Sequence, residues 1–355
     1  MSCYQVERRF PRSASIHPET QIGYVYKLAA GEEGTLVGVA SQDMSLRLID
    51  LERMEIVSQI GSAHASTITD LQHVPGTASG FISASNDGCV KVWDLRFSDP
   101  VVTIKLSSDF QDAPVFAASV SPNRTTCAAA CGPNISLFKY GEWKKYFEYS
   151  ESHFDNVSCM HFVAAQPDVL VSGADDGMVN IFNTTDLVNE DNGQCAMVTL
   201  NVGESVRSVN LKKNDKMFVF STSESVSVWN PSTGGKVRPD VDYLRSHPLI
   251  ASEETGWGNL LPEMNSDGSR LLAGNSTGTL VEFDTDIFEI AHIFPHIHTG
   301  VVRSACYLAP SSLLLTAGED GFLYSWKVVG HDDGETSVSK TSIRSNRSSV
   351  SSRPY

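Results

Sequence analysis

The chain has 355 residues, of which 41% are hydrophobic and 19% charged, a composition that supports a globular core and excludes disorder throughout. Asp and Glu number 42 against 27 Lys and Arg, giving a formal charge of −15, which disfavours direct binding to nucleic acid and allows a basic partner. No apolar run approaches the roughly 18 residues of a membrane span, and the N-terminus lacks a signal-peptide pattern. We therefore expect a protein of the cytoplasm or nucleus that does not enter membranes, with its seven scattered cysteines reduced.

Short runs of alternating β-branched and polar residues recur along the chain, and each run ends in a bulky apolar residue. In chain order, the residues that end the runs are Ile49, Trp93, Phe138, Phe182, Trp229, Phe283 and Trp326. Most of the intervals between them are 43 to 47 residues, and one is 54. A period of about 40–45 residues accommodates four short strands per unit. The alternation predicts that three strands of each unit lie within residues 36–49, 64–94, 113–139, 153–183, 204–230, 256–284 and 298–327, and that fourth strands follow at 101–106, 144–149 and 196–200.

Three of the units contain an Asp-Gly pair between two alternating runs, in the segments FISASNDGCVKVWD, LVSGADDGMVNIFN and LLTAGEDGFLYSWK. Asp-Gly flanked by such runs is a strong signal for a β-hairpin. The Asp stands six residues before the final bulky residue in all three units, as Asp87, Asp176 and Asp320, and Asp43 has the same offset from Ile49. Four matches at one offset indicate repeated units rather than chance composition.

With these spacings the chain resembles WD-repeat proteins, and its uneven units together with the AGEDGFLYSW segment and its SWK ending are most similar to the WD repeat-containing protein 89 family. The resemblance implies an all-β, seven-bladed WD-repeat β-propeller over residues 1–330 that serves as a non-enzymatic interaction platform. Nothing strand-like follows Trp326, so we expect the segment YQVERRF at 4–10 to supply the outer strand of the last blade and close the ring. The Ser-rich residues 331–355 are predicted to form a disordered tail.

A buried hydrogen-bond chain is the role that the resemblance implies for polar residues of the strongest units. The sets are His64, Ser83, Asp87 and Trp93 in the second unit, His153, Ser172 and Asp176 in the fourth, and His298, Thr316, Asp320 and Trp326 in the seventh. A buried indole N–H needs an acceptor, which the hydroxyl supplies, while His joins the hydroxyl to the Asp. The fourth unit has Phe182 in place of Trp, so its hydroxyl lacks an indole partner. The other units lack most of these residues and are expected to depend more on apolar packing.

Two other kinds of chemistry use the same residue types. Ser, His and Asp together also form catalytic triads, but one spacing repeated in separate units is typical of a structural device, so we expect no enzymatic activity. His292, His296 and His298 could be zinc ligands. However, His292 falls in a predicted outer strand and His298 already has a structural role, so we expect no metal and no cofactor.

The mouth of the central channel is the first candidate for binding a partner protein or peptide. In similar propellers the residue before the repeated Asp often faces this mouth, on what is called the top face. In this chain those residues are Gln42, Asn86, Asp175 and Glu319. They suggest a partly acidic mouth suited to a Lys- or Arg-bearing peptide. The alternative is a solvated polar rim without a ligand.

A long connection between the fifth and sixth units is the second candidate. The surplus of about ten residues in this interval lies in residues 240–257, and loops usually carry the specificity of a scaffold. Tyr243, Arg245 and Trp257 are of types enriched at binding hot spots. Trp257 could instead pack beneath the loop as part of the core.

The segment VWDLR at 92–96 is the third candidate, because residues 81–96 are similar to a pattern found in substrate receptors of cullin-4 ubiquitin ligases. The resemblance implies that Asp94 and Arg96 dock on the ligase adaptor. The alternative is a plain surface Arg. The leading hypothesis remains a scaffold that binds a partner through the top face, as part of a multiprotein complex.

Overall fold

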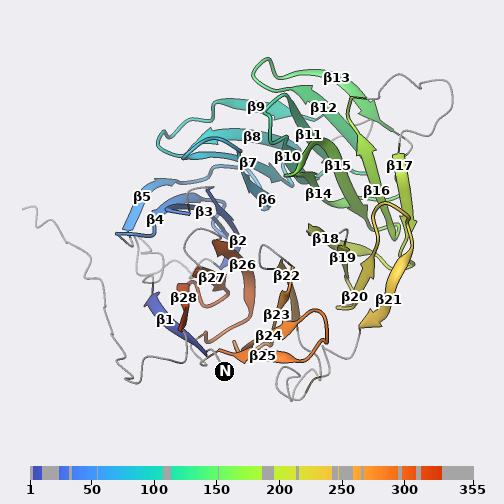
Figure 1. The fold of residues 1–355 in the computed structure, drawn as a ribbon. Coiled ribbons are helices and arrows are strands. Elements are labelled where there is room, and N and C mark those ends of the chain that lie inside the picture. The colour runs from blue at the N-terminus through green and yellow to red at the C-terminus, as the bar shows by residue number, and fades with distance from the viewer. Residues whose placement is uncertain are drawn as a thin grey trace, which may run out of the picture.

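The computed structural model describes most of the repeated region. The described residues are 3–9, 24–31, 34–53, 55–106, 113–150, 152–185, 196–212, 216–241, 247, 259–264, 268–294, 298–308 and 313–329. Every regular element within these ranges is a β-strand. The strands form seven four-stranded antiparallel sheets arranged as blades around a ring (Figure 1). The predicted all-β, seven-bladed propeller is therefore confirmed.

Each of the first six blades uses four consecutive strands, which follow one another from the channel outward. Blade 1 contains β2 (Val25–Ala30), β3 (Leu36–Ser41), β4 (Leu46–Asp50) and β5 (Glu55–Ile60). Blade 2 contains β6 (Ile68–His73), β7 (Gly80–Ser85), β8 (Cys89–Asp94) and β9 (Val102–Lys105). Blade 3 contains β10 (Val115–Val120), β11 (Thr126–Cys131), β12 (Asn134–Lys139) and β13 (Lys144–Tyr149).

Blades 4 to 6 follow the same order. Blade 4 contains β14 (Val157–Val163), β15 (Gln166–Ala174), β16 (Met178–Asn183) and β17 (Ala196–Asn201). Blade 5 contains β18 (Val206–Lys212), β19 (Lys216–Ser221), β20 (Val226–Trp229) and β21 (Lys236–Val241). Blade 6 contains β22 (Asn259–Met264), β23 (Arg270–Gly274), β24 (Leu280–Asp284) and β25 (Ile290–Ile293).

The last blade joins the two ends of the propeller. It contains β26 (Val302–Leu308), β27 (Leu313–Gly318), β28 (Leu323–Val329) and, as its outer strand, β1 (Cys3–Arg9). β1 runs antiparallel to β28, with Cys3 opposite Val329 and Arg9 opposite Tyr324 (Figure 1). The expected closure by the N-terminal segment is confirmed, and it leaves β28 without an open edge.

The first blade differs from the sequence prediction in its innermost strand. Residues 36–49, which were expected to hold three strands, contain only β3 and most of β4, while the innermost strand β2 lies earlier in the chain. The register of β2 against β3 shifts between Val25 and Lys27. The same shift occurs in blades 2, 3, 4, 5 and 7, so it does not set blade 1 apart. The strand VYKLAA has no period-two pattern of burial, and the prediction depended on such a pattern.

Hydrophobic packing lies between neighbouring blades rather than within one sheet. Trp93 of blade 2 packs with Leu48 of blade 1, and Phe138 of blade 3 packs with Ile82 of blade 2. Close approach is required in places: a Cβ atom added to Gly38 would lie 2.6 Å from the Phe81 ring. The seven bulky residues used to measure the repeat are all buried, so the period in the sequence reflects the spacing of these inter-blade contacts.

Candidate functional site: the top face and the central channel

The predicted hydrogen-bond chain is present in blade 2. Trp93 Nε1 donates to Ser83 Oγ over 2.8 Å, Ser83 Oγ lies 2.7 Å from His64 Nε2, and His64 Nδ1 lies 3.0 Å from Asp87 Oδ2. Because an indole can only donate, the Ser83 oxygen accepts from it and the Ser83 proton points to His64 Nε2. The imidazole proton is then on Nδ1 and points to Asp87, which also accepts the backbone N–H of Ala65.

The environment of His64 favours this neutral form. Burial lowers the pKa of His64, and the neighbouring Asp87 carboxylate offsets only part of the effect. Burial alone would raise the pKa of Asp87, but the backbone N–H of Ala65 and the contacts with His64 outweigh burial and lower it. The set therefore works as a fixed brace between the turn and the strand, with no exposed hydroxyl nucleophile, because Ser83 is fully buried.

Blade 7 contains the same chain with a threonine. Trp326 Nε1 donates to Thr316 Oγ1 over 2.8 Å, and His298 joins Thr316 to Asp320 over 2.8 and 2.9 Å. The threonine is fully buried, as the serine is in blade 2. The two chains thus share one geometry although they lie in separate blades.

Blade 4 contains a shortened chain. His153 lies 2.7 Å from Ser172 Oγ and 3.1 Å from Asp176 Oδ2, but Phe182 offers no donor to the serine. Asn180 Nδ2 lies 3.3 Å from His153 Nε2, so this blade has a second polar group beside the imidazole. Burial lowers the pKa of His153 as it does that of His64.

Blade 1 has a polar network that sequence reasoning missed. Asp43 was recognised by its offset, but its partner is the buried Arg47, whose Nη2 donates to Asp43 over 2.7 Å and whose Nη1 donates to Ser41 over 2.7 Å. Burial alone would raise the pKa of Asp43, but the hydrogen bonds from Arg47 and Ser45 outweigh it and lower the pKa. Arg47 lies in a strand of mostly hydrophobic residues and is not part of the repeated pattern, so the sequence did not indicate its role.

A second network missed from the sequence connects blades 6 and 7. Glu282 is fully buried and accepts from Tyr307 OH over 2.6 Å, while His292 Nδ1 lies 2.5 Å away. His292 lies in the outer strand β25, as predicted. His296 lies outside the described residues, and no group of three or more His, Cys, Asp or Glu within the described ranges is placed to hold a metal ion.

The four residues predicted at the channel mouth occupy equivalent places on one face of the ring. Each follows the second strand of its blade and donates its backbone N–H to the segment before the first strand: Gln42 to Tyr24, Asn86 to Thr67, Asp175 to Asn156 and Glu319 to Val301. We call the face that carries these turns the top face. The side chains of the first three are exposed and that of Glu319 is half-buried.

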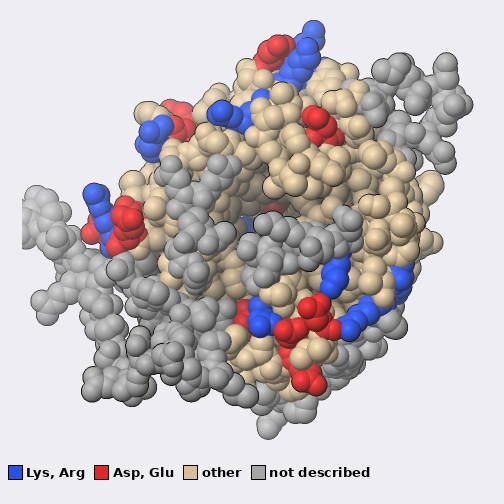
Figure 2. Space-filling model, in the orientation of Figure 1, with Lys and Arg blue, Asp and Glu red and all other residues tan. Residues whose placement is uncertain are grey.

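The two acidic members of this set already have partners within the protein. Glu319 accepts from Arg303 Nε over 2.8 Å, and Asp175 accepts from Ser205 Oγ over 2.6 Å. The mouth is therefore not simply acidic. On the face of the ring seen in Figure 2, basic and acidic side chains likewise lie in mixed groups near the periphery.

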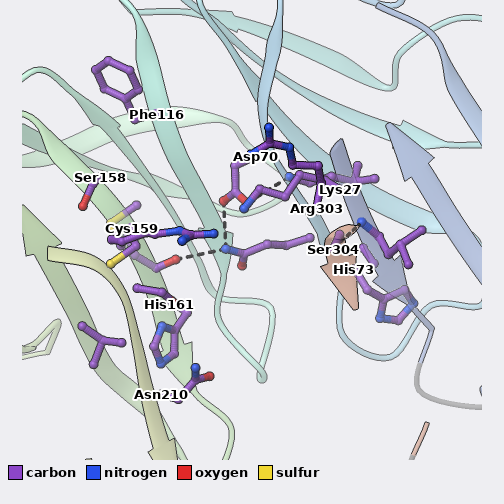
Figure 3. Close-up of a pocket in the computed structure, with 18 of the residues that line it drawn as sticks. Lys27, Asp70, His73, Phe116, Ser158, Cys159, His161, Asn210, Arg303 and Ser304 are labelled. Carbon is purple, nitrogen blue, oxygen red and sulfur yellow. Dashed lines mark hydrogen bonds and ion pairs between the residues drawn. The ribbon is translucent and has the colours of Figure 1, made fainter. Parts of the chain in front are cut away.

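The central channel holds a cavity of about 500 Å3 that sequence reasoning did not anticipate. Its wall includes Lys27, Arg303 and the largely buried Asp70 (Figure 3). Arg207 also lines it. Gln72 extends from blade 2 and donates from Nε2 to both Asp70 Oδ2 and the Met160 carbonyl of blade 4, each over 3.0 Å. The innermost strands therefore present a polar, hydrogen-bonded wall.

An exposed aromatic side chain marks the top face of blade 4. Phe154 is 90% exposed, although its backbone N–H is held by Asp176 Oδ2 over 2.9 Å. Exposed carboxylates lie along the same face at Asp155, Asp175 and Glu204. Sequence reasoning missed Phe154 because a lone aromatic after a structural His is more readily interpreted as core.

Comparisons with known proteins agree with this geometry. A family model described as "WD domain, G-beta repeat" matches residues 57–94, the part of the chain that holds the complete blade 2 hydrogen-bond chain. The chain is 23% identical to WD repeat-containing protein GTS1 of Arabidopsis thaliana, covering 94% of this chain and 88% of that protein. It is also 23% identical to a WD repeat-containing protein 89 homolog of Dictyostelium discoideum, over 88% and 86% of the two chains.

The chain is a seven-bladed WD-repeat propeller. A third relative, an uncharacterized WD repeat-containing protein of Saccharomyces cerevisiae, is 24% identical over 91% of this chain and 88% of that protein. The sequence similarity to these relatives extends over nearly the whole propeller, including the blades whose hydrogen-bond chains are incomplete. Within the described residues, no helix is long and apolar enough to cross a membrane.

The WDLR segment of the WD-repeat propeller lies at the other end of blade 2 from the Asp87 turn. Arg96 donates from Nε and Nη2 to the two oxygens of Asp94, over 2.9 and 2.5 Å, and Asp94 also accepts from Ser79. The Arg96 hydrogen bond lowers the pKa of Asp94 to about 2. The Arg96 side chain is 63% exposed, as is the neighbouring Phe97.

The loop predicted to carry specificity lies largely outside the described residues, including Tyr243, Arg245 and Trp257. His247, in the same loop, is half-buried with its ring 5.9 Å from that of Phe283 and nearly perpendicular to it. This part of the loop therefore contacts blade 6.

Proposed function

We propose that this WD-repeat propeller is a non-enzymatic scaffold that binds a partner protein or peptide through its top face, within a multiprotein complex. The observation that carries the proposal is Phe154, whose side chain is 90% exposed while Asp176 fixes its backbone. Burying a large aromatic ring against a partner is favourable. Because the loop is already ordered, its binding costs less conformational entropy than that of a mobile loop.

Charges beside Phe154 support a partner with Lys or Arg side chains. Asp155 and Asp175 are exposed, and the Asp175 backbone is hydrogen-bonded to Asn156, two residues after Phe154. Ser205 donates a hydrogen bond to Asp175. The residue before Ser205 is Glu204, a third exposed carboxylate, and blade 5 begins just after it. An apolar centre flanked by carboxylates favours an apolar partner surface with basic groups at its edge.

The cysteines support action in the cytoplasm or nucleus, where thiols remain reduced. Within the described residues, the free cysteines are Cys89, Cys127, Cys131, Cys159 and Cys306. Burial raises the pKa of Cys127 to about 12, so this thiol serves as a packing group rather than as a nucleophile.

The test is to purify the tagged full chain from cells and identify the proteins that accompany it. Phe154→Ala and Asp175→Lys should each lose the same partner, and loss of a hot-spot aromatic should weaken binding by about 30-fold, or about 2 kcal/mol. Phe97→Ala is the matched control, because it removes another exposed ring from the other end of a blade. If no partner depends on Phe154 more than on Phe97, the top-face proposal is wrong.

A second candidate function is that of a substrate receptor of a cullin-4 ubiquitin ligase. It is favoured by the exposure of Arg96 beside Phe97, which leaves a basic and apolar surface available for docking. Binding of purified ligase adaptor to the intact chain should be lost in Arg96→Ala and Asp94→Ala. Absence of any binding by the intact chain would remove this candidate.

A further inference from the structure

The cavity in the central channel is separate from the Phe154 surface. Its volume of about 500 Å3 is within the range of small-molecule sites. The wall is formed by the innermost strands, which the closed ring holds in place (Figure 3). A ligand there would meet a largely preformed site.

The residues that line the cavity include more basic than acidic side chains, unlike the chain as a whole. Lys27 of β2, Arg207 of β18 and Arg303 of β26 line the cavity, whereas Asp70 is the only carboxylate among the described lining residues. The full chain has a formal charge of −15. Positive groups gathered in a recess with low-dielectric walls focus the local potential, so the cavity favours an anion.

Two of the cations come from neighbouring blades and lie together. The backbone N–H of Leu28 in blade 1 donates to Ser304 Oγ in blade 7 over 3.1 Å, which aligns Lys27 with Arg303. Figure 3 shows both side chains extending toward Asp70 from the same side. Lys27 Nζ is 3.8 Å from Asp70 Oδ1, beyond hydrogen-bond range, and no described residue accepts a hydrogen bond from it.

Hydrogen bonds hold the Asp70 carboxylate in the cavity wall. Its Oδ2 accepts from Gln72 Nε2 over 3.0 Å and from the Ala118 backbone N–H over 3.3 Å. Burial raises the pKa of Asp70, although Lys27 and these hydrogen bonds oppose the rise. Oδ2 is therefore engaged by the wall, while Oδ1 lies nearest to Lys27.

Each of the three cations has a carboxylate partner: Lys27 forms an ion pair with Asp70, and the two arginines pair with carboxylates that do not line the cavity. Arg303 pairs with Glu319, and Arg207 Nη1 lies 2.7 Å from Glu224 Oε1. These pairs hold the guanidinium groups in place, but they also reduce the attraction for a single negative charge. An anion with several charges gains most, because it can contact blades 1, 5 and 7 at once.

We propose that the central channel binds a small molecule with two or more phosphate groups, one held by Lys27 and Arg303 and another by Arg207. Arg presents paired N–H donors that match phosphate oxygens, and Lys adds a compact positive charge. The ligand would bridge the first blade to the fifth and seventh.

The test is calorimetric titration of the full chain with inorganic tripolyphosphate, inositol hexakisphosphate and adenosine diphosphate at constant ionic strength. At least one should bind saturably at one site, and the ligand with the highest affinity identifies the group that carries the phosphates. Lys27→Gln and Arg303→Gln should each weaken its binding about tenfold or more. Lys145→Gln and Phe154→Ala should leave it unchanged, since Lys145 is similarly exposed but pairs with Glu148 on an outer strand.

Arg207→Gln provides an independent check on another blade. If the Lys27 or Arg303 variant melts early, the Arg207 variant decides the outcome by the same tenfold criterion. The proposal is overturned if none of the three compounds binds, or if Lys145→Gln weakens binding as much as the channel variants do. The latter result would indicate general attraction to surface lysines.

Discussion

Substitution of the two equivalent serines offers a direct measure of the buried hydrogen-bond chain. Ser83→Ala leaves both Trp93 Nε1 and His64 Nε2 without their partner, because each lies within 2.8 Å of Ser83 Oγ. An unsatisfied buried polar group costs about 1–3 kcal/mol, so we expect a loss of roughly 3–4 kcal/mol. Ser172→Ala in blade 4 removes one hydrogen bond of His153 Nε2, which keeps Asn180 Nδ2 at 3.3 Å, so the expected cost is about 0.5–1.5 kcal/mol.

The comparison cancels effects common to both sites. Both serines are fully buried and lose the same hydroxyl, so the cavity contributions are similar. Equilibrium urea unfolding should show that Ser83→Ala costs at least about 1 kcal/mol more than Ser172→Ala. In a Trp93→Phe background, which removes the indole N–H as in blade 4, the cost of Ser83→Ala should fall by at least about 1 kcal/mol. Equal costs in the wild-type background would refute the assignment of the indole as the serine's second partner.

Two further predictions concern closure and pH. Deleting residues 1–12 removes β1 and its pairing with β28. Each lost hydrogen bond lowers the free energy of unfolding by about 0.5–1.5 kcal/mol, so the melting temperature should fall sharply. Removal of residues 331–355 should not lower the melting temperature. Equal melting temperatures for the two truncated proteins would contradict closure by β1. Stability should decline as pH falls below about 6.5, because burial lowers the pKa of both His64 and His153 and the unfolded chain then binds more protons. His64→Gln with His153→Gln should flatten this part of a melting-temperature profile measured from pH 7.5 to 5.5; an unchanged slope would assign the pH dependence to other groups.

Local signals accounted for the parts of the fold that were predicted correctly. Hairpin turns and alternating runs lie within about 15 residues of one another, so the sequence around Asp87, Asp176 and Asp320 contained enough information to place three blades. The innermost strand of blade 1 was missed because VYKLAA has no period-two pattern of burial. Arg47 was missed because an Arg within this strand is not part of the repeat pattern, although its partner Asp43 is.

The site was less predictable, because its residues meet only after the ring closes. Leu28 and Ser304 are 276 positions apart, yet their hydrogen bond aligns Lys27 with Arg303. No spacing within one repeat indicates that contact. The sequence placed Glu319 at the mouth, but its pairing with Arg303 joins two different strands of blade 7, 16 positions apart along the chain.

Closure and ligand binding share the junction between blades 7 and 1. β1 completes the blade whose innermost strand carries Arg303, and β2 of the next blade carries Lys27. A polyphosphate that contacts both blades binds the closed ring and not the unfolded chain, so it stabilises the fold by about 2.7 kcal/mol at 100 times its Kd. The stabilisation requires that the two strands stay aligned by the Leu28–Ser304 hydrogen bond. The N-terminal strand therefore supports the cavity from the far side of its blade, although it contributes no residue to the wall.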